Sequence, residues 1–551
     1  MLVQSRNLWK GRLHLGFLFN QVQETLMAVT ALGVVDSPKG QDSPRWYATG
    51  FAMVALIVAL RLLLHLLTAN RYGIFRDELY YCACSQHLAW GYVDMPPFVP
   101  AVTWLFTKLL GSSLFVLRLI PALSESAAVA LTGYLAYQFG GKRYAVALSA
   151  LSIGVSAVFV INGHLLGTND FEPLLWMGCA AIVIRIVQTG TQKLWLWFGV
   201  LAGIGLLNKY SISIFGLGIV VGLVLTSERK ALAHKWIWIA GLIAFLIFLP
   251  NFLWNVRHDW PFVQLMHNIH QSGRDVQLGP GRFFLQQVGM ANPFAFPLWV
   301  AGLLWLFFGR EGRRYRVLGW AYVVTFAIIA VLHGKDYYLA PAYPMLFAAG
   351  SVVCESWLEG SQRLRWLKPT FLLLLIIPFL ALLPIFAPVI SVERYVAFQK
   401  AIHYAPPISE HSHARSPLPQ YYSDELGWEA MVAEVARIYH NLPPDVQAKT
   451  GIKASDYGQA GAIDYFGPKY ELPKAICEHQ NYWFWGTHRY TGESMILVDE
   501  GNPEHLAEIT SHSEKAGHFE YPYALENFDI YYIQDLKVPL DEIWAHEKNW
   551  D

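Results

Sequence analysis

Long apolar stretches recur along the first 391 residues, and short polar breaks separate them. The stretches approach or reach the roughly 20 residues that an α-helix needs to cross a bilayer. About eleven spans are predicted, at residues 47–68, 114–139, 144–161, 172–189, 194–208, 210–226, 236–254, 286–308, 317–333, 338–357 and 370–391. The pattern therefore predicts an α-helical polytopic membrane protein, with membrane lipid around a multi-span domain at residues 47–391.

The segments on either side of this domain have a different character. Residues 1–46 place acidic residues among modest apolar stretches, so we expect a cytoplasmic lead-in, or a start codon assigned too early, rather than a signal peptide. Residues 392–551 combine a helical pattern at 428–439 with strand-like runs at 494–498 and 528–533. They are predicted to form a small soluble α/β domain.

Charge is distributed unevenly along the chain. Residues 1–391 contain 29 Lys and Arg against 16 Asp and Glu, whereas residues 392–551 contain 12 against 25. With a cytoplasmic N-terminus the basic clusters fall in inner loops, as the positive-inside rule expects. The sequence thus predicts a multi-pass inner-membrane protein whose C-terminal domain is extracytoplasmic. An acidic domain is a poor ligand for nucleic acid, so no nucleic-acid partner is expected.

The cysteines give no sign of a disulfide framework or of a metal site. Only one of the five lies in residues 392–551, so packing must hold that domain together. Cys82 and Cys84 lie near His87, but a structural metal site needs a further pair of ligands. No metal is predicted.

The most informative segment runs from Arg76 to Pro97, directly after the first predicted span. It places Asp77, Glu78 and Asp94 among aromatic and basic side chains. Apolar surroundings raise the pKa of a carboxyl group, which makes it a useful general base near neutral pH. Aromatic side chains of the segment that are expected to bind substrate are Tyr80, Tyr81, Trp90 and Tyr92. An interfacial aromatic belt with snorkelling charges is the alternative interpretation.

Two further groups of ionisable residues are expected on the outer face. Asp170 and Lys209 each lie at the mouth of a predicted span, where a charge is costly unless it has a function. His333, Lys335 and Tyr337 lie in a short connection close to membrane depth. A lysine there is suited to bind a lipid phosphate and to stabilise it as a leaving group. A snorkelling Lys209 and mutual neutralisation of neighbouring charges at Lys335 are the alternatives.

These parts suit the transfer of a sugar from a polyprenyl phosphate to an acceptor hydroxyl. A carboxylate would take the hydroxyl proton while cations stabilise the departing phosphate. No glycine-rich nucleotide-binding fingerprint follows a predicted strand, which favours a lipid-linked donor. A secondary transporter of a polar or lipid-linked substrate is the main alternative, and a non-catalytic assembly subunit is a third hypothesis.

Two motifs carry a resemblance to a known family: Arg-Asp-Glu-x-Tyr-Tyr at residues 76–81, and Leu-Ala-Trp-Gly-Tyr-x-Asp-x-Pro-Pro at residues 88–97. They resemble the first outer loop of bacterial family 39 glycosyltransferases, relatives of protein mannosyltransferases and of the lipid A aminoarabinose transferase. The resemblance covers roughly residues 47–350. It implies the GT-C architecture and an inverting transfer from a polyprenyl-phosphate sugar to an envelope glycolipid, glycan or protein.

The resemblance also implies roles for individual residues. It makes Asp77 the general base, with Glu78 beside it and Asp170 as the second-loop acid. It makes Lys209 the phosphate-binding residue, and Lys335 would lie near the same phosphate. Met95 stands where relatives commonly have histidine, so no imidazole acts at that position. No cofactor is required by the resemblance; some relatives bind a divalent metal near the acidic pair, but nothing in this sequence demands one.

Overall fold

The computed structural model describes residues 45–273, 277–406, 416–499 and 503–551. The chain divides into two compact units, Met1–Ala48 and Thr49–Asp551. The predicted cytoplasmic lead-in lies almost wholly outside the described residues. The predicted boundary at residue 391 lies within the second unit and stays a prediction.

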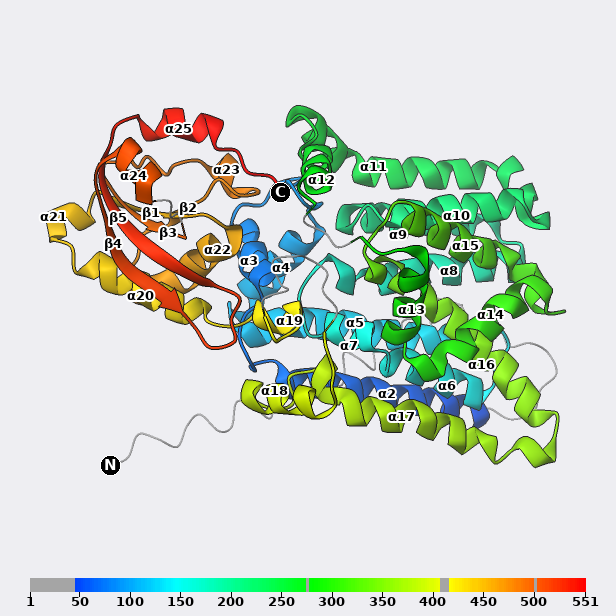
Figure 1. Cartoon of the computed structure of the whole chain (residues 1–551). Helices are drawn as coiled ribbons and strands as arrows, with labels where there is room; N and C mark the ends of the chain where they lie inside the picture. Colours follow the sequence, from blue (N-terminus) through cyan, green and yellow to red (C-terminus); the bar gives the residue numbers. More distant parts are fainter. Residues whose placement is uncertain (1–44, 274–276, 407–415, 500–502) are drawn as a thin grey trace, which may run out of the picture. The chain divides into compact units, whose positions relative to one another are not determined.

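Helices make up most of this unit (Figure 1). Those before residue 391 are α2 (Arg45–Thr68), α3 (Arg76–Gln86), α4 (Phe98–Leu110), α5 (Leu114–Gln138), α6 (Arg143–Gly154), α7 (Ala157–Asn162), α8 (Glu172–Thr189), α9 (Trp195–Asn208), α10 (Ile212–Val224), α11 (Lys235–Arg257), α12 (Pro261–Ser272), α13 (Pro280–Met290), α14 (Phe296–Phe308), α15 (Arg316–Val331), α16 (Tyr343–Glu359) and α17 (Leu367–Phe386). Among the described residues, six helices are long and apolar enough to cross a membrane, or up to eight if each bent pair is one span. A multi-pass helical protein is therefore confirmed. The remaining expected spans correspond to shorter or less apolar helices, so the number eleven stays a prediction.

One predicted span, at residues 286–308, is not a continuous helix. The segments Pro280–Met290 and Pro293–Phe308 meet at an angle of 97°. Asn292 lies between them with φ 66°, and its side chain accepts a hydrogen bond from the backbone N–H of Phe294. Pro293 follows and has no N–H to donate to a preceding turn. The hydrophobic stretch continues through Asn292, but the helix is interrupted there.

Glycines let neighbouring membrane helices approach closely. On α14, a Cβ added at Gly302 would lie 2.2 Å from the carbonyl oxygen of Leu346 on α16. On α16, a Cβ added at Gly350 would lie 1.9 Å from the carbonyl oxygen of Leu298 on α14. The same type of contact recurs where α10 meets α15 and where α9 meets α11. Small residues suit these contacts because lipid provides no hydrophobic force between helices and packing must supply the attraction.

The C-terminal domain is the predicted α/β unit. The elements after residue 391 are α18 (Val392–Ala401), α19 (Gln420–Ser423), α20 (Trp428–His440), α21 (Pro444–Gln447), β1 (Thr450–Ala454), α22 (Tyr457–Phe466), β2 (Ala475–Ile476), α23 (Tyr482–Trp485), β3 (Ser494–Val498), α24 (Pro503–Ile509), β4 (Thr510–Glu520), β5 (Asn527–Leu536) and α25 (Leu540–His546). The strands form one sheet in the order β2-β1-β3-β5-β4, in which β1 is parallel to β2 and β3 and the other pairs are antiparallel. The predicted helix at 428–439 and the predicted strands at 494–498 and 528–533 are confirmed.

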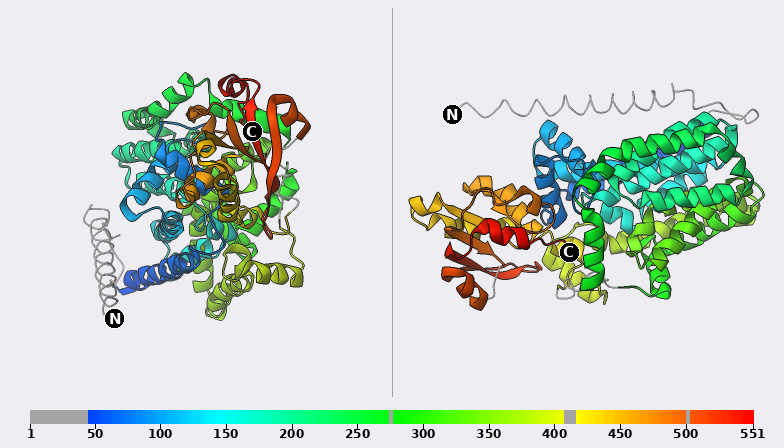
Figure 2. Two further views of the ribbon diagram at one scale, coloured as in Figure 1. Left: turned by 90° about the vertical axis from the view of Figure 1, so that its left-hand side faces the viewer. Right: turned by 90° about the horizontal axis from the view of Figure 1, so that it is seen from above.

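This domain lies at one end of the helices of the same unit, where α22 packs on α3 (Figures 1 and 2). The contact is close because α22 presents two glycines to α3. A Cβ added at Gly461 would lie 3.0 Å from the backbone carbon of Leu79, and one at Gly458 would lie 2.5 Å from Cγ of Arg76. The α22 glycines therefore bring the C-terminal domain directly against the first predicted acidic motif.

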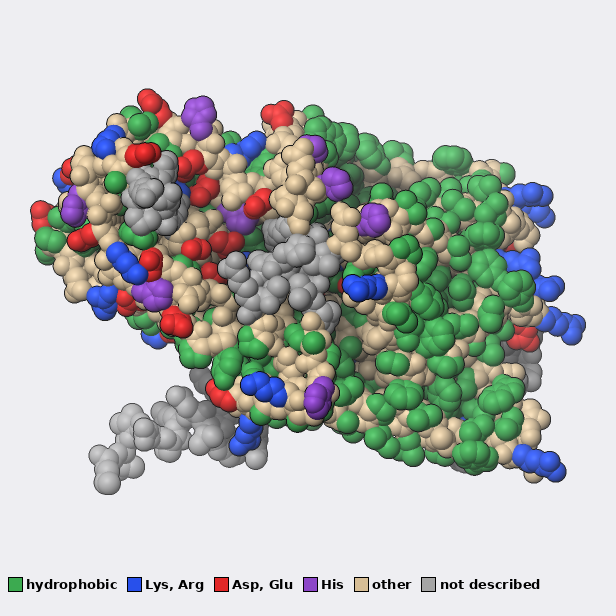
Figure 3. Space-filling view, viewed as in Figure 1, with side chains coloured by type: hydrophobic (Ala, Val, Ile, Leu, Met, Phe, Trp, Pro, Cys, Tyr) green, Lys and Arg blue, Asp and Glu red, His purple; other side chains and the backbone are tan. Residues whose placement is uncertain are grey.

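The side chains on the visible face separate by type (Figure 3). Hydrophobic side chains cover the helical part, whereas Asp and Glu gather on the C-terminal domain. Lys and Arg gather at the helix ends far from that domain. This is the distribution expected for a bilayer around the helices, and the predicted orientation in the membrane remains a prediction.

Replacing Gly350 by alanine tests the packing of α14 on α16. The added methyl meets a backbone carbonyl that cannot rotate away, so we expect a loss of about 1–3 kcal/mol of stability. The measurement is thermal unfolding of the detergent-solubilised protein, in which the variant should melt several degrees lower. The control is Gly241→Ala on α11, where an added Cβ meets nothing within 4 Å. Equal melting of both variants would contradict the close approach of these helices.

Candidate active site

Helix α3 positions the first predicted acidic pair. It begins at Arg76, and the carboxylate of Glu78 accepts a hydrogen bond from the backbone N–H of Phe75, which caps the first turn. Asp77 and Glu78 both lie in this first turn, where negative charge is favoured by the helix dipole. Nearly all later residues of α3 are buried, so the helix presents its N-terminal end to the site.

Arg76 is held by acidic residues of the C-terminal domain. Its guanidinium lies 2.5 Å from Oε1 of Glu526, 3.9 Å from Asp424 and 4.0 Å from Asp456. Its side chain is only 14% exposed. A guanidinium removed from water needs such partners, because an unpaired buried charge costs several kcal/mol. The start of α3 is therefore fixed by residues that lie more than 300 positions later in the sequence.

Asp77 faces the same domain. Its Oδ1 accepts a hydrogen bond of 2.7 Å from the hydroxyl of Tyr457, the first residue of α22. Asp77 is half-buried, so its carboxylate lies in the interface without being sealed from a ligand.

Glu78 has a different environment, although it is the next residue. It is fully buried, and Oε1 lies 2.8 Å from Nε of Arg118 while also accepting the N–H of Leu166. Arg118 lies in addition 3.5 Å from Glu425 of the C-terminal domain. Burial raises the pKa of Glu78, although Arg118 and the backbone donors oppose this change. These contacts favour a structural role for Glu78, and its predicted catalytic role remains a prediction.

Asp94 is the third carboxylate of the predicted segment. Its Oδ1 accepts a hydrogen bond of 3.0 Å from the hydroxyl of Tyr80, which is itself buried and accepts the N–H of Asn481. Burial raises the pKa of Asp94 to about 6, and the nearby charge of Asp77 acts in the same direction. The carboxyl group of Asp94 therefore titrates close to neutral pH.

Tyr81 is influenced by the charges of several predicted acids. Burial raises the pKa of its hydroxyl well above the ordinary value, and the carboxylates of Asp77, Asp94 and Asp170 raise it further. The charges of three acids, one on α3, one in the loop after α3 and one in the 3-10 helix Thr168–Asp170, therefore act on one phenol. The structure brings these predicted residues together.

Lys209 lies beside this group of acids. Its Nζ donates hydrogen bonds to Oδ1 of Asn169 and to Oε2 of Glu172, the latter at 3.3 Å. Asp170 lies between Asn169 and Glu172 in the sequence, and its side chain is buried. Its carboxylate accepts a hydrogen bond of 2.6 Å from the backbone N–H of Gly167. Burial raises the pKa of Asp170 well above its ordinary value, whereas Lys209 opposes that change. The predicted acid and the predicted phosphate ligand are thus electrostatic neighbours.

One residue of the third predicted group, which comprises His333, Lys335 and Tyr337, lies near Lys209. The ammonium of Lys209 lies 4.3 Å from the ring centroid of Tyr338 and 5.8 Å from that of Tyr337, both in the short 3-10 helix Asp336–Ala342. Lys335 is half-buried and directly precedes this helix. His333 is exposed in a turn with φ 52°. The cluster thus contributes Tyr337 to the surroundings of Lys209, and the binding roles of Lys335 and His333 remain predictions.

The predicted aromatic residues have unequal environments. Tyr92 is fully buried, and its hydroxyl contacts the carbonyl oxygens of Cys84 and His87, so it closes the loop after α3. Trp90 is 59% exposed, and its carbonyl accepts a hydrogen bond of 2.7 Å from Asn251 on α11. Of the two, Trp90 is the one whose ring is accessible to a substrate.

Several residues of the site were not predicted. Tyr457, Glu172, Asn169 and Tyr338 all contact a predicted site residue. Glu172 and Asn169 carry a local signal, because they flank Asp170 at the mouth of a span. No local sequence signal indicates that Tyr457 contacts Asp77, since only the docking of α22 on α3 brings the two residues together.

His479 extends the ion cluster around Arg76. Its Nδ1 lies 3.1 Å from Oδ2 of Asp456, and its Nε2 lies 3.3 Å from a carboxylate oxygen of Asp551. Burial opposes a charge on this imidazole, but the hydrogen bonds and charges of Asp456 and Asp551 outweigh it and raise the pKa to about 9. His479 is therefore a cation at neutral pH and joins Arg76 in holding Asp456.

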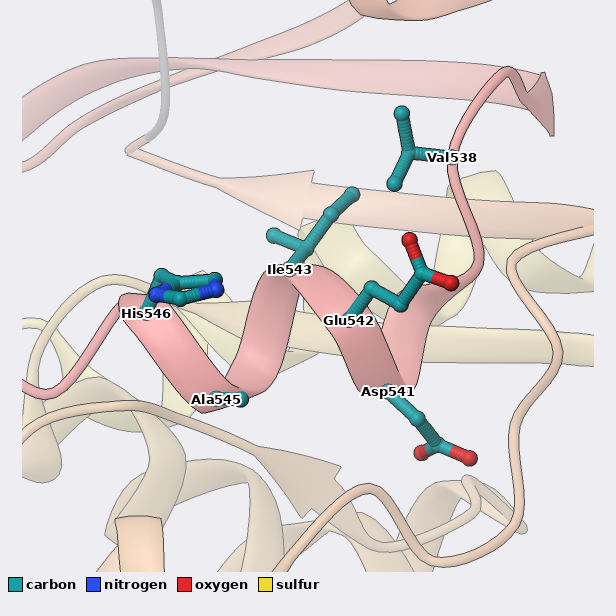
Figure 4. Close-up of a pocket in the computed structure, with 6 residues that line it drawn as sticks. All are labelled: Val538, Asp541, Glu542, Ile543, Ala545 and His546. Atoms are coloured by element: carbon teal, nitrogen blue, oxygen red, sulfur yellow. The ribbon is translucent and has the colours of Figure 1, made fainter.

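Within the described ranges, no three His, Cys, Asp or Glu side chains are placed to hold a metal ion. A pocket on α25 contains none of the predicted site residues (Figure 4). It is lined by Val538, Asp541, Glu542, Ile543, Ala545 and His546. The metal and cofactor expectations remain predictions.

Two sequence comparisons relate the chain to glycosyltransferases. Residues 94–254 match the family model of dolichyl-phosphate-mannose-protein mannosyltransferases. The lipid A galacturonosyltransferase RgtD of Rhizobium johnstonii is 28% identical over 255 residues, which are 45% of this chain and 52% of RgtD. The chain thus matches about half the length of this curated relative. The segment matched by the family model includes Asp94, Asp170 and Lys209.

Comparison with solved structures identifies the fold. ArnT from Cupriavidus metallidurans in the apo state superposes with a TM-score of 0.56 at 16% identity, over 88% of this chain and 97% of ArnT. ArnT bound to undecaprenyl phosphate gives a TM-score of 0.56 at 15% identity, over 87% and 98% of the two chains. The predicted resemblance to family 39 glycosyltransferases and the predicted GT-C fold are confirmed.

The charge on His479 predicts a specific dependence of stability on pH. Because its pKa is raised from 6.5 to about 9 on folding, it contributes stability fully below pH 6.5 and loses that contribution as the pH rises through about 9. The melting temperature of the wild-type protein should fall across this interval, and His479→Gln should flatten the fall. The control is His518→Gln, an exposed residue of β4 that pairs with Asp529. A wild-type slope retained in His479→Gln would exclude this assignment.

Proposed function

We propose that this protein is an inverting membrane glycosyltransferase that moves a sugar from a polyprenyl phosphate to a hydroxyl of an extracytoplasmic glycolipid. The observation that carries the proposal is that the charges of Asp77, Asp94 and Asp170 all act on Tyr81, while Lys209 donates hydrogen bonds to Asn169 and Glu172 on either side of Asp170. A base and a phosphate ligand at one site are what this transfer requires. The fold shared with ArnT bound to undecaprenyl phosphate supports a polyprenyl-phosphate donor, and RgtD supports a lipid acceptor.

Asp77 is the general base of the proposed reaction. It lies in the first turn of a largely buried helix and is itself half-buried, so part of its side chain is accessible to a ligand. Glu78 is occupied by Arg118 and by two backbone donors. Burial raises the pKa of Asp94 to about 6, so near neutral pH this group is less fully ionised than an ordinary aspartate. A base must be ionised before it can accept a proton, so the raised pKa of Asp94 argues against Asp94 as the base.

Lys209 is the proposed ligand of the donor phosphate. An ammonium has three N–H donors, and Asn169 and Glu172 accept two hydrogen bonds from it. We expect the third donor to bind a phosphate oxygen close to the rings of Tyr337 and Tyr338, which lie 5.8 and 4.3 Å from the ammonium. These two rings would pack against the lipid-linked part of the donor and keep water from the phosphate.

The proposed reaction is a single displacement at the anomeric carbon. The acceptor oxygen forms a bond to this carbon while the bond between the carbon and the phosphate oxygen breaks. The acceptor proton passes to the carboxylate of Asp77, and the electron pair of the broken bond stays on the lipid phosphate. Lys209 stabilises the charge that gathers on the phosphate as it leaves. Attack from the side opposite the leaving group inverts the configuration of the sugar.

A transporter remains the alternative interpretation of charged residues at span ends. Both sequence comparisons carry the names of transferases, which favours catalysis over transport. The proposed orientation has the C-terminal domain and the site outside the inner membrane, in agreement with the Lys and Arg side chains at the far helix ends (Figure 3).

Asp77→Asn tests the proposed base. The amide keeps the size of the side chain and can still accept a hydrogen bond, but it cannot take a proton. Transfer from undecaprenyl phosphates carrying galacturonic acid, galactose or mannose to lipid A should fall by at least about 100-fold. Protein abundance in the membrane should not change. Asp259→Asn, at an exposed carboxylate in the loop after α11, is the matched control and should retain full activity. Full activity in Asp77→Asn would refute the proposed mechanism.

Lys209→Met tests the proposed phosphate ligand. Loss of a charged hydrogen bond to the phosphate should weaken binding of undecaprenyl phosphate to the purified protein by about ten-fold or more. Lys209→Arg keeps the charge and should retain more of the affinity. The matched control is Lys142→Met, which removes a lysine paired with Glu359 at 2.9 Å. Unchanged affinity in Lys209→Met would show that the phosphate binds elsewhere.

A further inference from the structure

The N-terminal end of α22 lies against the N-terminal end of α3. Gly458 and Gly461 allow this contact, since a side chain at either position would collide with Arg76 or Leu79. Tyr457 precedes Gly458 and is the first residue of α22. Its side chain is therefore directed to α3 by the docking of the whole helix rather than by a flexible loop.

The ring and the hydroxyl of Tyr457 are both held. The ring centroid lies 4.9 Å from that of Tyr80 and 4.9 Å from that of His479. The hydroxyl donates a hydrogen bond of 2.7 Å to Oδ1 of Asp77. Burial, together with the charges of Asp77 and Asp456, raises the pKa of this phenol well above its ordinary value. Tyr457 therefore keeps its proton and acts as a fixed donor.

Asp456 ties the same helix end to the residue before Asp77. Its Oδ1 accepts a hydrogen bond of 2.6 Å from the N–H of Gly458 and so caps α22. Its Oδ2 lies 4.0 Å from the guanidinium of Arg76 and 3.1 Å from Nδ1 of His479. The cap and the first residue of α22 thus contact the first two residues of α3, which leaves the Tyr457 hydroxyl little freedom to leave Asp77.

We propose that Tyr457 is a positioning residue for Asp77, so that the C-terminal domain completes the active site. This inference rests on the proposed function, because it concerns the base of that reaction. The hydrogen bond to Oδ1 fixes the rotation of the carboxylate and stabilises its charged form, which is the form that accepts the acceptor proton. The domain acts on the reaction through this contact, in addition to any contact that it makes with the acceptor.

Tyr457→Phe removes the hydroxyl and keeps the ring between Tyr80 and His479. The expected result is a fall in kcat of about ten-fold with little change in KM for the lipid-linked donor, because the base is ionised and oriented less well. The acid limb of the kcat/KM profile should move up by about one pH unit, since the donor that favours the charged form of the base is lost. A residue with a purely structural role would not shift this limb.

The matched control is Tyr465→Phe on the same helix. Its hydroxyl donates to the carbonyl of Ser112, whereas that of Tyr457 donates to Asp77. All variants are assayed well below the melting temperature of the least stable one, so that unfolding does not imitate a loss of rate. Tyr465→Phe should match the wild type in kcat and in pH profile.

The outcomes separate this inference from the proposed function. If Asp77→Asn keeps full activity, the proposed function fails and the role of Tyr457 fails with it. If Asp77→Asn is inactive while Tyr457→Phe matches the wild type in kcat and pH profile, the inference alone is overturned. A change confined to KM in Tyr457→Phe would also overturn it, because that result places Tyr457 in substrate binding.

Discussion

The buried ion cluster around Arg76 is the interaction on which the arrangement of the site depends. Its partners Asp424, Asp456 and Glu526 all belong to the C-terminal domain. A guanidinium in this position without them would be an uncompensated buried charge, at a cost of several kcal/mol. Arg76 can therefore hold its place only while the domain is docked. Because Asp77 is the next residue on the same helix, the docking that neutralises Arg76 also sets the direction of the proposed base.

Burial then gives neighbouring carboxylates different properties. Asp456 lies between Arg76 and His479, and these two cations hold its pKa below the ordinary value although burial opposes them. Glu526 also pairs with Arg76, but burial and the surrounding acids raise its pKa to about 7. One carboxylate thus remains ionised while its neighbour approaches neutrality, which reduces repulsion within the cluster. Burial likewise raises the pKa of Asp94, which accepts a hydrogen bond from Tyr80, to about 6.

Local patterns in the sequence predicted the elements better than the contacts between them. The helix α20 and the strands β3 and β5 carry clear periodicity, and ionisable residues at span ends were enough to select Asp170 and Lys209. The bend at Asn292 escaped prediction because hydropathy averages over a change in backbone direction. Tyr457 escaped because no local pattern reports a partner 380 residues away. Asp77 and Glu78 looked alike in sequence, yet consecutive residues of a helix point about 100° apart and so meet different surroundings.

Asp77 is the proposed base, whereas Glu78 takes part in buried ion pairs. This difference bears on whether the protein is a transferase or a transporter. Glu78 joins α3 to Arg118 of α5, and Arg118 in turn reaches Glu425 of the C-terminal domain. Separating these elements would leave buried charges without partners, so the connection resists their relative motion. An alternating-access transporter requires large movements of one helix group against another. A transferase benefits from the opposite property, because groups fixed before the reaction need no reorganisation when charge develops. The rigid connection through Arg118 therefore favours catalysis at the end of α3.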